Sequence, residues 1–497
     1  LNASRYTPSS TLQRMELLKT GYMGTLSLGW DNYLFLELTG RQERSSTLKD
    51  QSFFYPSANL SFLFTQAFHM PSWWNYGKLR LSYGIVGNAP ETYTANIVYE
   101  QGSDNGFTWN TIPSSWGNAD IRPEKKYEYE IGLESKFLNN RLGIDVSYYN
   151  NRVKDQILST PQPSTSGVKN VLMNVGEVAN HGWDISISAT PILTRDFRWD
   201  LTANYGVYKN KVVKLADGVP YLEILNSGGS GIKIQAVEGQ PMGDIYAQVP
   251  QVNENGEYLV SDKGLYLNQT ELQKVGNINP AGVGGLFNSF SYKNVFLDFS
   301  IDFRIGGDVI NEMNQYATAV GLTPESLKYR DTEHGGLSYY YPGDNNSSGI
   351  PVQVDPSTGA GPNGEIIYHD GIILPGVVAS TGERNTRIIP AGYYYNTTYN
   401  WGTEAEQLTY RHSVFDNSYV KLRELTIGYQ FPEKMISKLG LGRLSVSVFG
   451  RNLFYFYKAL KNYDAESSVG TSWANQATVG SSTTATRSFG VSLRASF

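Results

Sequence analysis

The feature that most constrains this chain is an alternation of apolar and polar residues with a period of two. In the segment YEYEIGLE at 127–134, tyrosine, isoleucine and leucine occupy one set of positions and glutamate and glycine the other. The same alternation occurs at 142–149, 197–208, 295–304 and 488–497. It gives a β-strand one apolar and one polar face. We therefore expect an all-β protein.

Thirteen segments carry this pattern, although 54–68 and 418–430 alternate less cleanly than the others. No stretch of about 18 apolar residues occurs, so the sequence predicts no helical membrane span. The thirteen predicted strands are 22–30, 33–43, 54–68, 76–86, 125–136, 141–150, 182–191, 197–208, 285–293, 295–304, 418–430, 443–453 and 487–497.

The links between these strands alternate between short and long. Five links are long, and connections of this length are uncommon in compact soluble domains. Bacterial outer-membrane barrels combine short turns on one side with long loops on the other, and strands of about ten residues can cross a bilayer when tilted. We therefore predict a transmembrane antiparallel up-and-down β-barrel with long extracellular loops, the long links being 87–124, 151–181, 209–284, 305–417 and 454–486.

A soluble β-sandwich, propeller or β-solenoid is the alternative, because its strands also alternate. Against it, the polar positions hold a mixture of Asp, Glu, Arg, Asn, Ser and Gly, and Trp or Tyr residues stand at strand ends, as at Trp30, Trp183 and Trp199. Aromatic residues gather in this way at membrane interfaces. Carboxylates are costly to desolvate, so the polar face must be wet and the apolar face must contact lipid.

Thirteen is an odd number of strands, whereas bacterial single-chain barrels normally have an even number. An open edge strand in lipid would be very unfavourable. We therefore expect residues 1–497 to be the C-terminal part of a larger barrel, with the remaining barrel supplied by another polypeptide. The stretch 231–238 is the candidate for a missed fourteenth strand.

Composition and motifs argue against an enzyme and against a nucleic-acid-binding protein. With 41 basic and 46 acidic residues the net charge is −5, which gives no attraction to nucleic acid. The absence of Cys excludes disulfides and thiolate chemistry, and the five His show no H-E-x-x-H spacing. Carboxylates that share a strand face, such as Glu128 and Glu130, are explained by contact of that face with water and need no catalytic role. We therefore expect no catalytic residues.

Several motifs occur in an ordered series from about residue 20 to the end of the chain. NADIRPE at 118–124 and YEIGLE at 129–134 resemble a strand motif NP-x-L-x-P-E … E-x-G-L-E/D, and NVGEVANHG at 174–182 resembles N-x-G-x-x-x-N-x-G. SYVKLRELTIGY at 418–429 is similar to Y-x-K-L-R-E-L-x-L-G-Y, and SVFGRNL at 447–453 to G-x-N-L. The chain thereby resembles the SusC/RagA-like TonB-dependent outer-membrane transporters. It departs from that pattern at 464–466, where Asp-Ala-Glu stands in place of the usual D-P-E.

The resemblance implies a 22-stranded barrel in the outer membrane of a Gram-negative bacterium, with this chain supplying about 13 strands. It further implies TonB-energised import of a large nutrient, an oligosaccharide or an oligopeptide, with a SusD-like surface lipoprotein as lid. On this view the plug domain and the TonB box lie outside this chain, and the TonB complex acts through them. An outer-membrane receptor or adhesion barrel without transport remains the alternative.

Aromatic residues in the long links are the candidates for contact with the substrate or with the lid, because exposed rings stack on sugars or anchor protein partners. The alternative is that these rings pack the large links onto one another. The candidates are Phe107, Trp109, Trp116, Tyr339, Tyr340, Tyr341, Tyr393, Tyr394, Tyr395, Tyr399 and Trp401.

Two oxygen-rich stretches, 344–346 and 355–365, suggest either a calcium site in an extracellular loop or a solvated turn cluster. We expect no other cofactor and no other metal site.

Overall fold

The computed structural model describes residues 14–496 apart from 50–51, 97, 105–106, 114, 162–163, 169, 228–230, 344–348, 401–408, 438–439, 468–469, 471 and 481–484. The chain forms two compact units. Unit 1 comprises residues 1–189, 208–222 and 237–240, and unit 2 comprises 190–207, 223–236 and 241–497.

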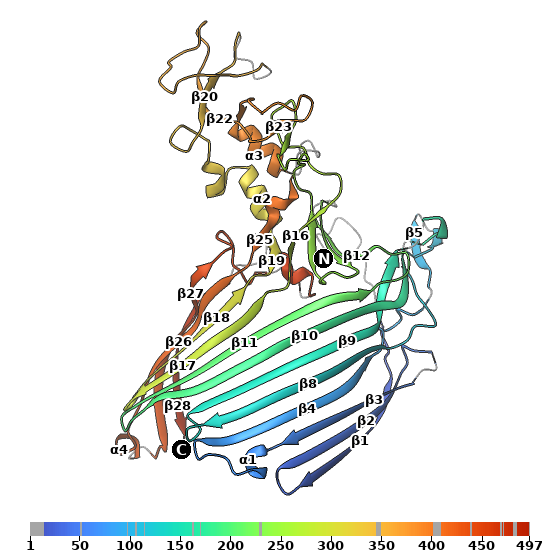
Figure 1. Ribbon diagram of the computed structural model, residues 1–497, viewed down its shortest axis with the longest axis vertical. Coiled ribbons are helices and arrows are strands. Elements are labelled where there is room, and N and C mark those ends of the chain that lie inside the picture. Colours follow the sequence, from blue (N-terminus) through green and yellow to red (C-terminus); the bar gives the residue numbers. More distant parts are fainter. Residues whose placement is uncertain are drawn as a thin grey trace, which may run out of the picture. The chain divides into compact units, whose positions relative to one another are not determined.

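Among the described residues, thirteen antiparallel strands run through the main sheet, and each pairs with the next of them along the chain (Figure 1). A short fourteenth strand, β7 (Ser115–Trp116), pairs in parallel with β10. The order of the thirteen strands is therefore up-and-down, and all thirteen predicted segments are confirmed as strands. The thirteen strands are β1 (Lys19–Trp30), β2 (Leu34–Ser45), β3 (Ser52–Phe62), β4 (Trp74–Asn88), β8 (Glu124–Phe137), β9 (Leu142–Pro161), β10 (Asn170–Leu193), β11 (Phe197–Lys214), β17 (Gly282–Tyr292), β18 (Val295–Ile305), β26 (Tyr419–Gln430), β27 (Arg443–Lys458) and β28 (Ser488–Ser496).

Three details differ from the sequence predictions. The segment 54–68 stops being a strand at Phe62 and continues into the short helix α1 (Phe64–Ala67). The predicted long link 151–181 is largely strand. The hairpin of β9 and β10 extends into it, since β9 ends only at Pro161 and β10 already begins at Asn170. The stretch 231–238 is not a barrel strand. It forms β13 (Ile232–Val237) of a separate four-stranded sheet, with buried side chains on both of its faces.

The two faces of the main sheet differ in character. In unit 1, Leu81 on β4 and Ile131 on β8 are cross-strand partners on the apolar face and are 38% and 47% exposed. On the opposite face the Arg80 guanidinium lies 2.6 Å from Asp145 and 3.6 Å from Glu134. Gly132 makes room for this guanidinium, since a Cβ there would lie 2.8 Å from it. A soluble sandwich would bury the apolar face, so the exposed apolar face confirms the predicted partition.

A bulge explains why 418–430 alternates less cleanly than the other segments. Lys421 and Arg423 are polar, whereas Ile427 and Tyr429, also at odd positions, are apolar. In the register of β26 with β18, Arg423 is an extra residue between Leu422 and Glu424. A bulge shifts the alternation by one residue. The bulge therefore keeps Lys421 and Arg423 on the same face of the sheet as the polar residues that follow them in β26.

The long links of the chain contain their own secondary structure. Residues 215–281 and 306–418 hold most of it, and the other links contribute shorter pieces. These elements are β5 (Glu100–Asp104), β6 (Phe107–Thr111), β7 (Ser115–Trp116), η1 (Ser164–Ser166), β12 (Tyr221–Ser227), β14 (Asp244–Ala247), β15 (Leu259–Val260), β16 (Gln273–Asn277), β19 (Asp308–Ile310), α2 (Glu312–Ala319), η3 (Pro324–Leu327), β20 (Leu337–Tyr340), β21 (Val352–Gln353), β22 (Tyr368–Ile372), β23 (Val377–Val378), β24 (Ile389–Pro390), α3 (Ala391–Tyr399), η4 (Tyr410–Ser413), β25 (Val414–Asp416), α4 (Glu433–Ile436) and η6 (Asn475–Ala477).

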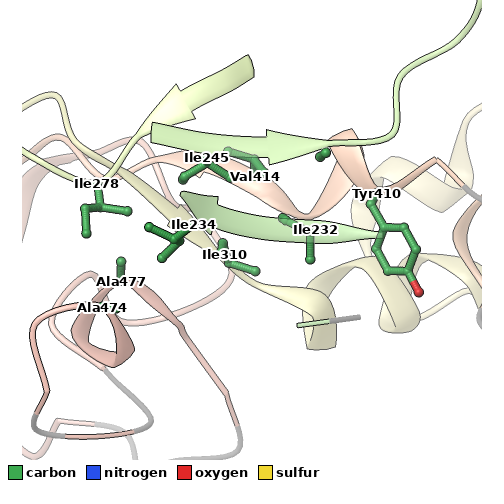
Figure 2. Close-up of a cluster of buried hydrophobic side chains, with 10 residues drawn as sticks. Ile232, Ile234, Ile245, Ile278, Ile310, Tyr410, Val414, Ala474 and Ala477 are labelled. Carbon is green, nitrogen blue, oxygen red and sulfur yellow. The ribbon is translucent and has the colours of Figure 1, made fainter. Parts of the chain in front are cut away.

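Three links of unit 2 that are far apart in the sequence share one hydrophobic core (Figure 2). Ile234 and Ile245 come from the link after β11, Ile310 and Val414 from the link after β18, and Ala477 from the link after β27. Ile234, Ile245 and Ile310 are fully buried. Ordering long links costs conformational entropy, which burial of apolar surface offsets.

No helix of the described residues is both long and apolar enough to cross a membrane.

Candidate ligand-binding loops

The three predicted aromatic residues of unit 1 lie on short strands of the link after β4. Phe107 and Trp109 are on the β5–β6 hairpin and are 78% and 49% exposed, and Trp116 on β7 is half-buried. The Trp109 ring covers the backbone of Gly102, where a Cβ would overlap it at 2.2 Å. These rings are accessible to a ligand, and their contact with a substrate or a lid stays a prediction.

The aromatic run at 339–341 mostly fills the interior of its own link. Tyr339 and Tyr341 are 1% and 4% exposed, and both rings contact Tyr368 at 5.5 and 5.9 Å between ring centres. These three rings belong to one link, so they pack that link onto itself. Tyr340 is half-buried.

The run at 393–395 lies in the first turns of helix α3, which begins at Ala391 and ends at Tyr399. Tyr393 is 38% exposed, Tyr394 is half-buried, and Tyr395 and Tyr399 are buried. Tyr394 contacts both Tyr395 and Tyr399, at 5.1 and 6.1 Å between ring centres. Residues four positions apart lie on one side of a helix, which brings Tyr395 and Tyr399 together at 5.7 Å between ring centres. The last candidate, Trp401, lies outside the described residues.

Five tyrosines line a cavity of about 420 Å³, called here the tyrosine pocket: Tyr266, Tyr329, Tyr394, Tyr395 and Tyr399. The segment 371–375 and residues Glu325, Gly335 and Leu337 complete the lining. Tyr266 comes from the link after β11 and the other four rings from the link after β18. The sequence candidates included the three rings of α3 but missed Tyr266 and Tyr329, because neither belongs to an aromatic run.

Several tyrosines of the tyrosine pocket have a raised pKa. Burial raises the pKa of Tyr266, and the nearby Tyr394 raises it further. Burial raises the pKa of Tyr395 and of Tyr399 in the same way. The Tyr395 hydroxyl donates to the backbone oxygen of Glu325 at 2.7 Å, whereas the described residues provide no hydrogen-bond partner for the hydroxyls of Tyr266 and Tyr329.

A histidine beside the tyrosine pocket makes this region sensitive to acid. The His412 ring stacks on Tyr399 at 4.3 Å between ring centres, with an angle of 18° between the planes. Burial lowers the pKa of His412 to about 4, and the charge of Arg411 adds to the effect. An unfolded histidine titrates near pH 6.5, so the folded state binds fewer protons between pH 4 and 6.5.

We therefore expect the stability that His412 contributes to be complete above pH 6.5 and lost as the pH falls toward 4. The loss is on the order of 2 kcal/mol, allowing for partial solvent exposure. Hydrogen–deuterium exchange of α3, corrected for the intrinsic rate, should accelerate over this range. His412→Phe keeps a stacked ring without a titrating group and should remove the acceleration, and an unchanged pH profile in that variant would contradict the assignment.

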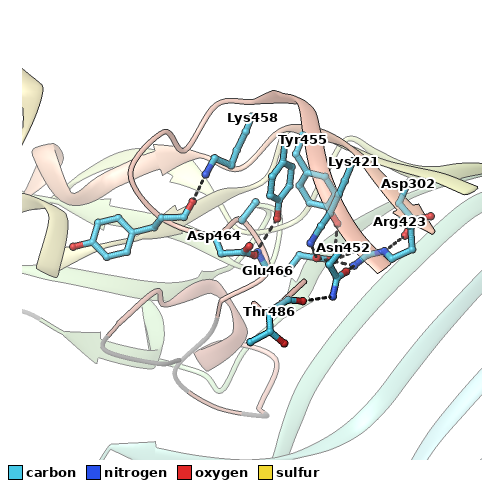
Figure 3. Close-up of polar contacts among 12 residues, drawn as sticks. Asp302, Lys421, Arg423, Asn452, Tyr455, Lys458, Asp464, Glu466 and Thr486 are labelled. Carbon is cyan, nitrogen blue, oxygen red and sulfur yellow. Dashed lines mark hydrogen bonds and ion pairs between the residues drawn. The ribbon is translucent and has the colours of Figure 1, made fainter. Parts of the chain in front are cut away.

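A second polar site anchors the link after β27 to the main sheet within unit 2 (Figure 3). The Glu466 carboxylate accepts hydrogen bonds from Lys421 Nζ at 2.6 Å and from Arg423 Nη1 at 2.8 Å. Arg423 Nε also donates to Asp302 at 2.6 Å. Lys421 is 1% exposed, so Glu466 neutralises a buried charge. Burial raises the pKa of Glu466, but the bonds and charges of Arg423 and Lys421 outweigh burial and hold it at about 2.

Asp464 holds the turn that presents Glu466. Its carboxylate accepts from the Tyr455 hydroxyl at 3.0 Å and from the Glu466 backbone N–H at 2.9 Å. The Asn417 amide donates to the Ala465 backbone oxygen at 2.9 Å. The stretch Asp-Ala-Glu thus retains both carboxylates of the D-P-E pattern from which it departs, and both make contacts with neighbouring strands.

The described residues contain no group of three His, Cys, Asp or Glu placed to hold a metal ion. Asp355 accepts from the backbone N–H and the hydroxyl of Ser357. Hydrogen bonds from Asn363, followed by the backbone N–H of Gly343, lower the pKa of Glu365 to about 2. The carboxylates of Asp355 and Glu365 thus accept hydrogen bonds from nearby residues of their own loops, as is typical of turns. Residues 344–346 lie outside the described part, and calcium stays an expectation.

This chain is similar to known β-barrel receptors. The family model "TonB dependent receptor-like, beta-barrel" matches residues 3–250. TonB-dependent receptor P3 of Formosa agariphila is 24% identical over 90% of this chain and 42% of its own length. The chain belongs to the TonB-dependent receptor family.

A second curated relative and a solved structure also resemble the chain. TonB-dependent receptor SusC of Bacteroides thetaiotaomicron is 30% identical over 46% of this chain and 24% of SusC. The structure of the RagAB peptide transporter matches with a TM-score of 0.64 at 19% identity, covering 90% of this chain and 45% of that one. This TonB-dependent receptor chain therefore spans less than half the length of each of these relatives. The structural likeness shows the shared fold.

Proposed function

We propose that this chain is the C-terminal barrel portion of an outer-membrane transporter that imports a large nutrient with energy supplied through TonB. The observation that carries the proposal is the main sheet, which exposes an apolar face and pairs charges such as Arg80 and Asp145 on the other. A lipid-facing wall with a wet lumen requires this partition. Membership of the TonB-dependent receptor family supports the same function.

The described residues fit the role of a wall and a capture surface. The polar face of the sheet carries charge pairs such as Arg80 and Asp145, and the links of unit 2 carry the tyrosine pocket. Energy coupling would come from a plug domain and a TonB box outside this chain. A SusD-like surface lipoprotein would act as the lid, which the relationship to SusC supports. The substrate would be an oligosaccharide or an oligopeptide.

Uptake in the source bacterium tests this function. Cells lacking the gene region for this chain should fail to grow on an oligomeric nutrient that supports the parent strain, yet should grow normally on its monomers. A protonophore should abolish accumulation of the labelled oligomer in the parent strain while leaving surface binding intact. Binding to the parent cells without accumulation would contradict transport and favour the receptor or adhesion barrel.

A further inference from the structure

We propose that the tyrosine pocket binds a single uncharged sugar residue of a longer chain. The inference names the substrate class of the site described above and rests on the proposed import function for its biological use. Three observations carry it: the size and walls of the pocket, its free hydroxyl groups and its lack of free charge.

The size and walls of the tyrosine pocket suit a ring with one apolar face. Its volume of about 420 Å³ lies within the roughly 300–1,000 Å³ typical of small-ligand sites. Tyr394 packs on Tyr395 and Tyr399, and Tyr266, Tyr329 and Tyr394 pack against a buried cluster that includes Leu265 and Leu374. Rings held by such packing lose little entropy on binding. They offer faces on which the C–H groups of a sugar can stack.

The free hydroxyl groups of the tyrosine pocket supply hydrogen bonds. Tyr266 and Tyr329 lack a partner among the described residues although both are partly buried, so each hydroxyl can donate and accept toward a ligand. A polar group that becomes enclosed without a partner is costly. A sugar carries hydroxyls around its edge and would satisfy both tyrosines while its face meets the rings.

The charge of the tyrosine pocket discriminates between ligand classes. None of its described lining residues is Lys, Arg or His, and its one carboxylate, Glu325, is paired with Lys328 at 2.8 Å. An acidic sugar or the C-terminal carboxylate of a peptide would therefore lose its hydration without gaining a cation. A free amino terminus would have to compete with Lys328 for Glu325. A neutral sugar meets neither obstacle.

The test uses the full chain, purified in detergent, on an array of neutral glycans, acidic glycans and short peptides. We expect the protein to bind neutral glycans, and calorimetry with the best-bound glycan to give affinities about 3–10-fold weaker for each of Tyr266→Phe and Tyr329→Phe. Each variant removes one hydroxyl and keeps the ring. Tyr393→Phe is the matched control, because Tyr393 lies on α3 outside the lining and should bind as the parent does.

The outcomes separate this inference from the proposed function. The inference would be overturned if the protein bound no neutral glycan, or if it bound only peptides or acidic glycans. Unchanged glycan affinity in both pocket variants would also overturn it, even if cells import an oligomer. Conversely, neutral glycan binding that depends on Tyr266 and Tyr329, without uptake by cells, would uphold the pocket and refute transport.

Discussion

Replacing Glu466 by alanine should release the link after β27 from the main sheet of unit 2. The substitution leaves Lys421 buried without a counter-charge, and breaking a buried ion pair in this way costs roughly 3–5 kcal/mol. We expect about 3 kcal/mol, because the Glu466 side chain is 30% exposed and water can partly replace it. Limited proteolysis should cut within 459–487 much faster than in the parent protein.

Glu424→Ala is the matched control for this experiment. Glu424 lies on the same strand as Lys421 and pairs with Arg451 at 3.1 Å, but both partners are exposed, so the loss should be about 1 kcal/mol or less. Adding Lys421→Met to Glu466→Ala removes the orphaned charge and should restore much of the protection. If Glu466→Ala were cleaved no faster than Glu424→Ala, the anchoring role of Glu466 would be wrong.

Placing a lysine at position 81 should destabilise the chain in a bilayer far more than placing one at position 82. Leu81 and Ser82 are neighbours at the middle of β4, with Leu81 on the exposed apolar face and Ser82 on the opposite face. A lysine that faces lipid near the bilayer centre costs about 2–4 kcal/mol. At position 82 a lysine would face Glu130, its cross-strand neighbour, in the wet interior.

The comparison is made by denaturant unfolding of the chain reconstituted in vesicles, followed by tryptophan fluorescence. Leu81→Lys should lower the free energy of unfolding by about 2–4 kcal/mol, whereas Ser82→Lys should change it by less than about 1 kcal/mol. Equal losses at the two positions would show that both faces contact the same medium. That result would remove the basis of the membrane assignment.

The strands of the main sheet could be predicted from sequence because period-two alternation is a local property. In a segment such as 127–134, the alternation alone assigns each residue to the apolar or the polar face of the strand, whichever strands pair with it. Segments with weak alternation are those where the pattern has another cause or is interrupted. The stretch 231–238 alternates weakly because β13 is buried on both faces, and 418–430, although correctly predicted as a strand, is out of phase because Arg423 forms a bulge against β18.

The candidate site was only partly predictable. The tyrosines of α3 stand out as a run, but a run does not reveal which ring reaches a cavity and which one fills a core. Tyr339 and Tyr341 are buried beside Tyr368, although in sequence they look no different from Tyr393 and Tyr394. Tyr266 joins the tyrosine pocket from another link altogether.

The all-β class, the thirteen strands and the separation of an apolar from a polar face could be read from the sequence, because they follow from the spacing of neighbouring residues. The neutralisation of the buried Lys421 by Glu466, the core shared by three distant links and the cavity lined by five tyrosines became visible only in three dimensions. Such contacts join residues far apart in the chain, and they depend on how long links bury apolar surface against one another to offset their loss of entropy.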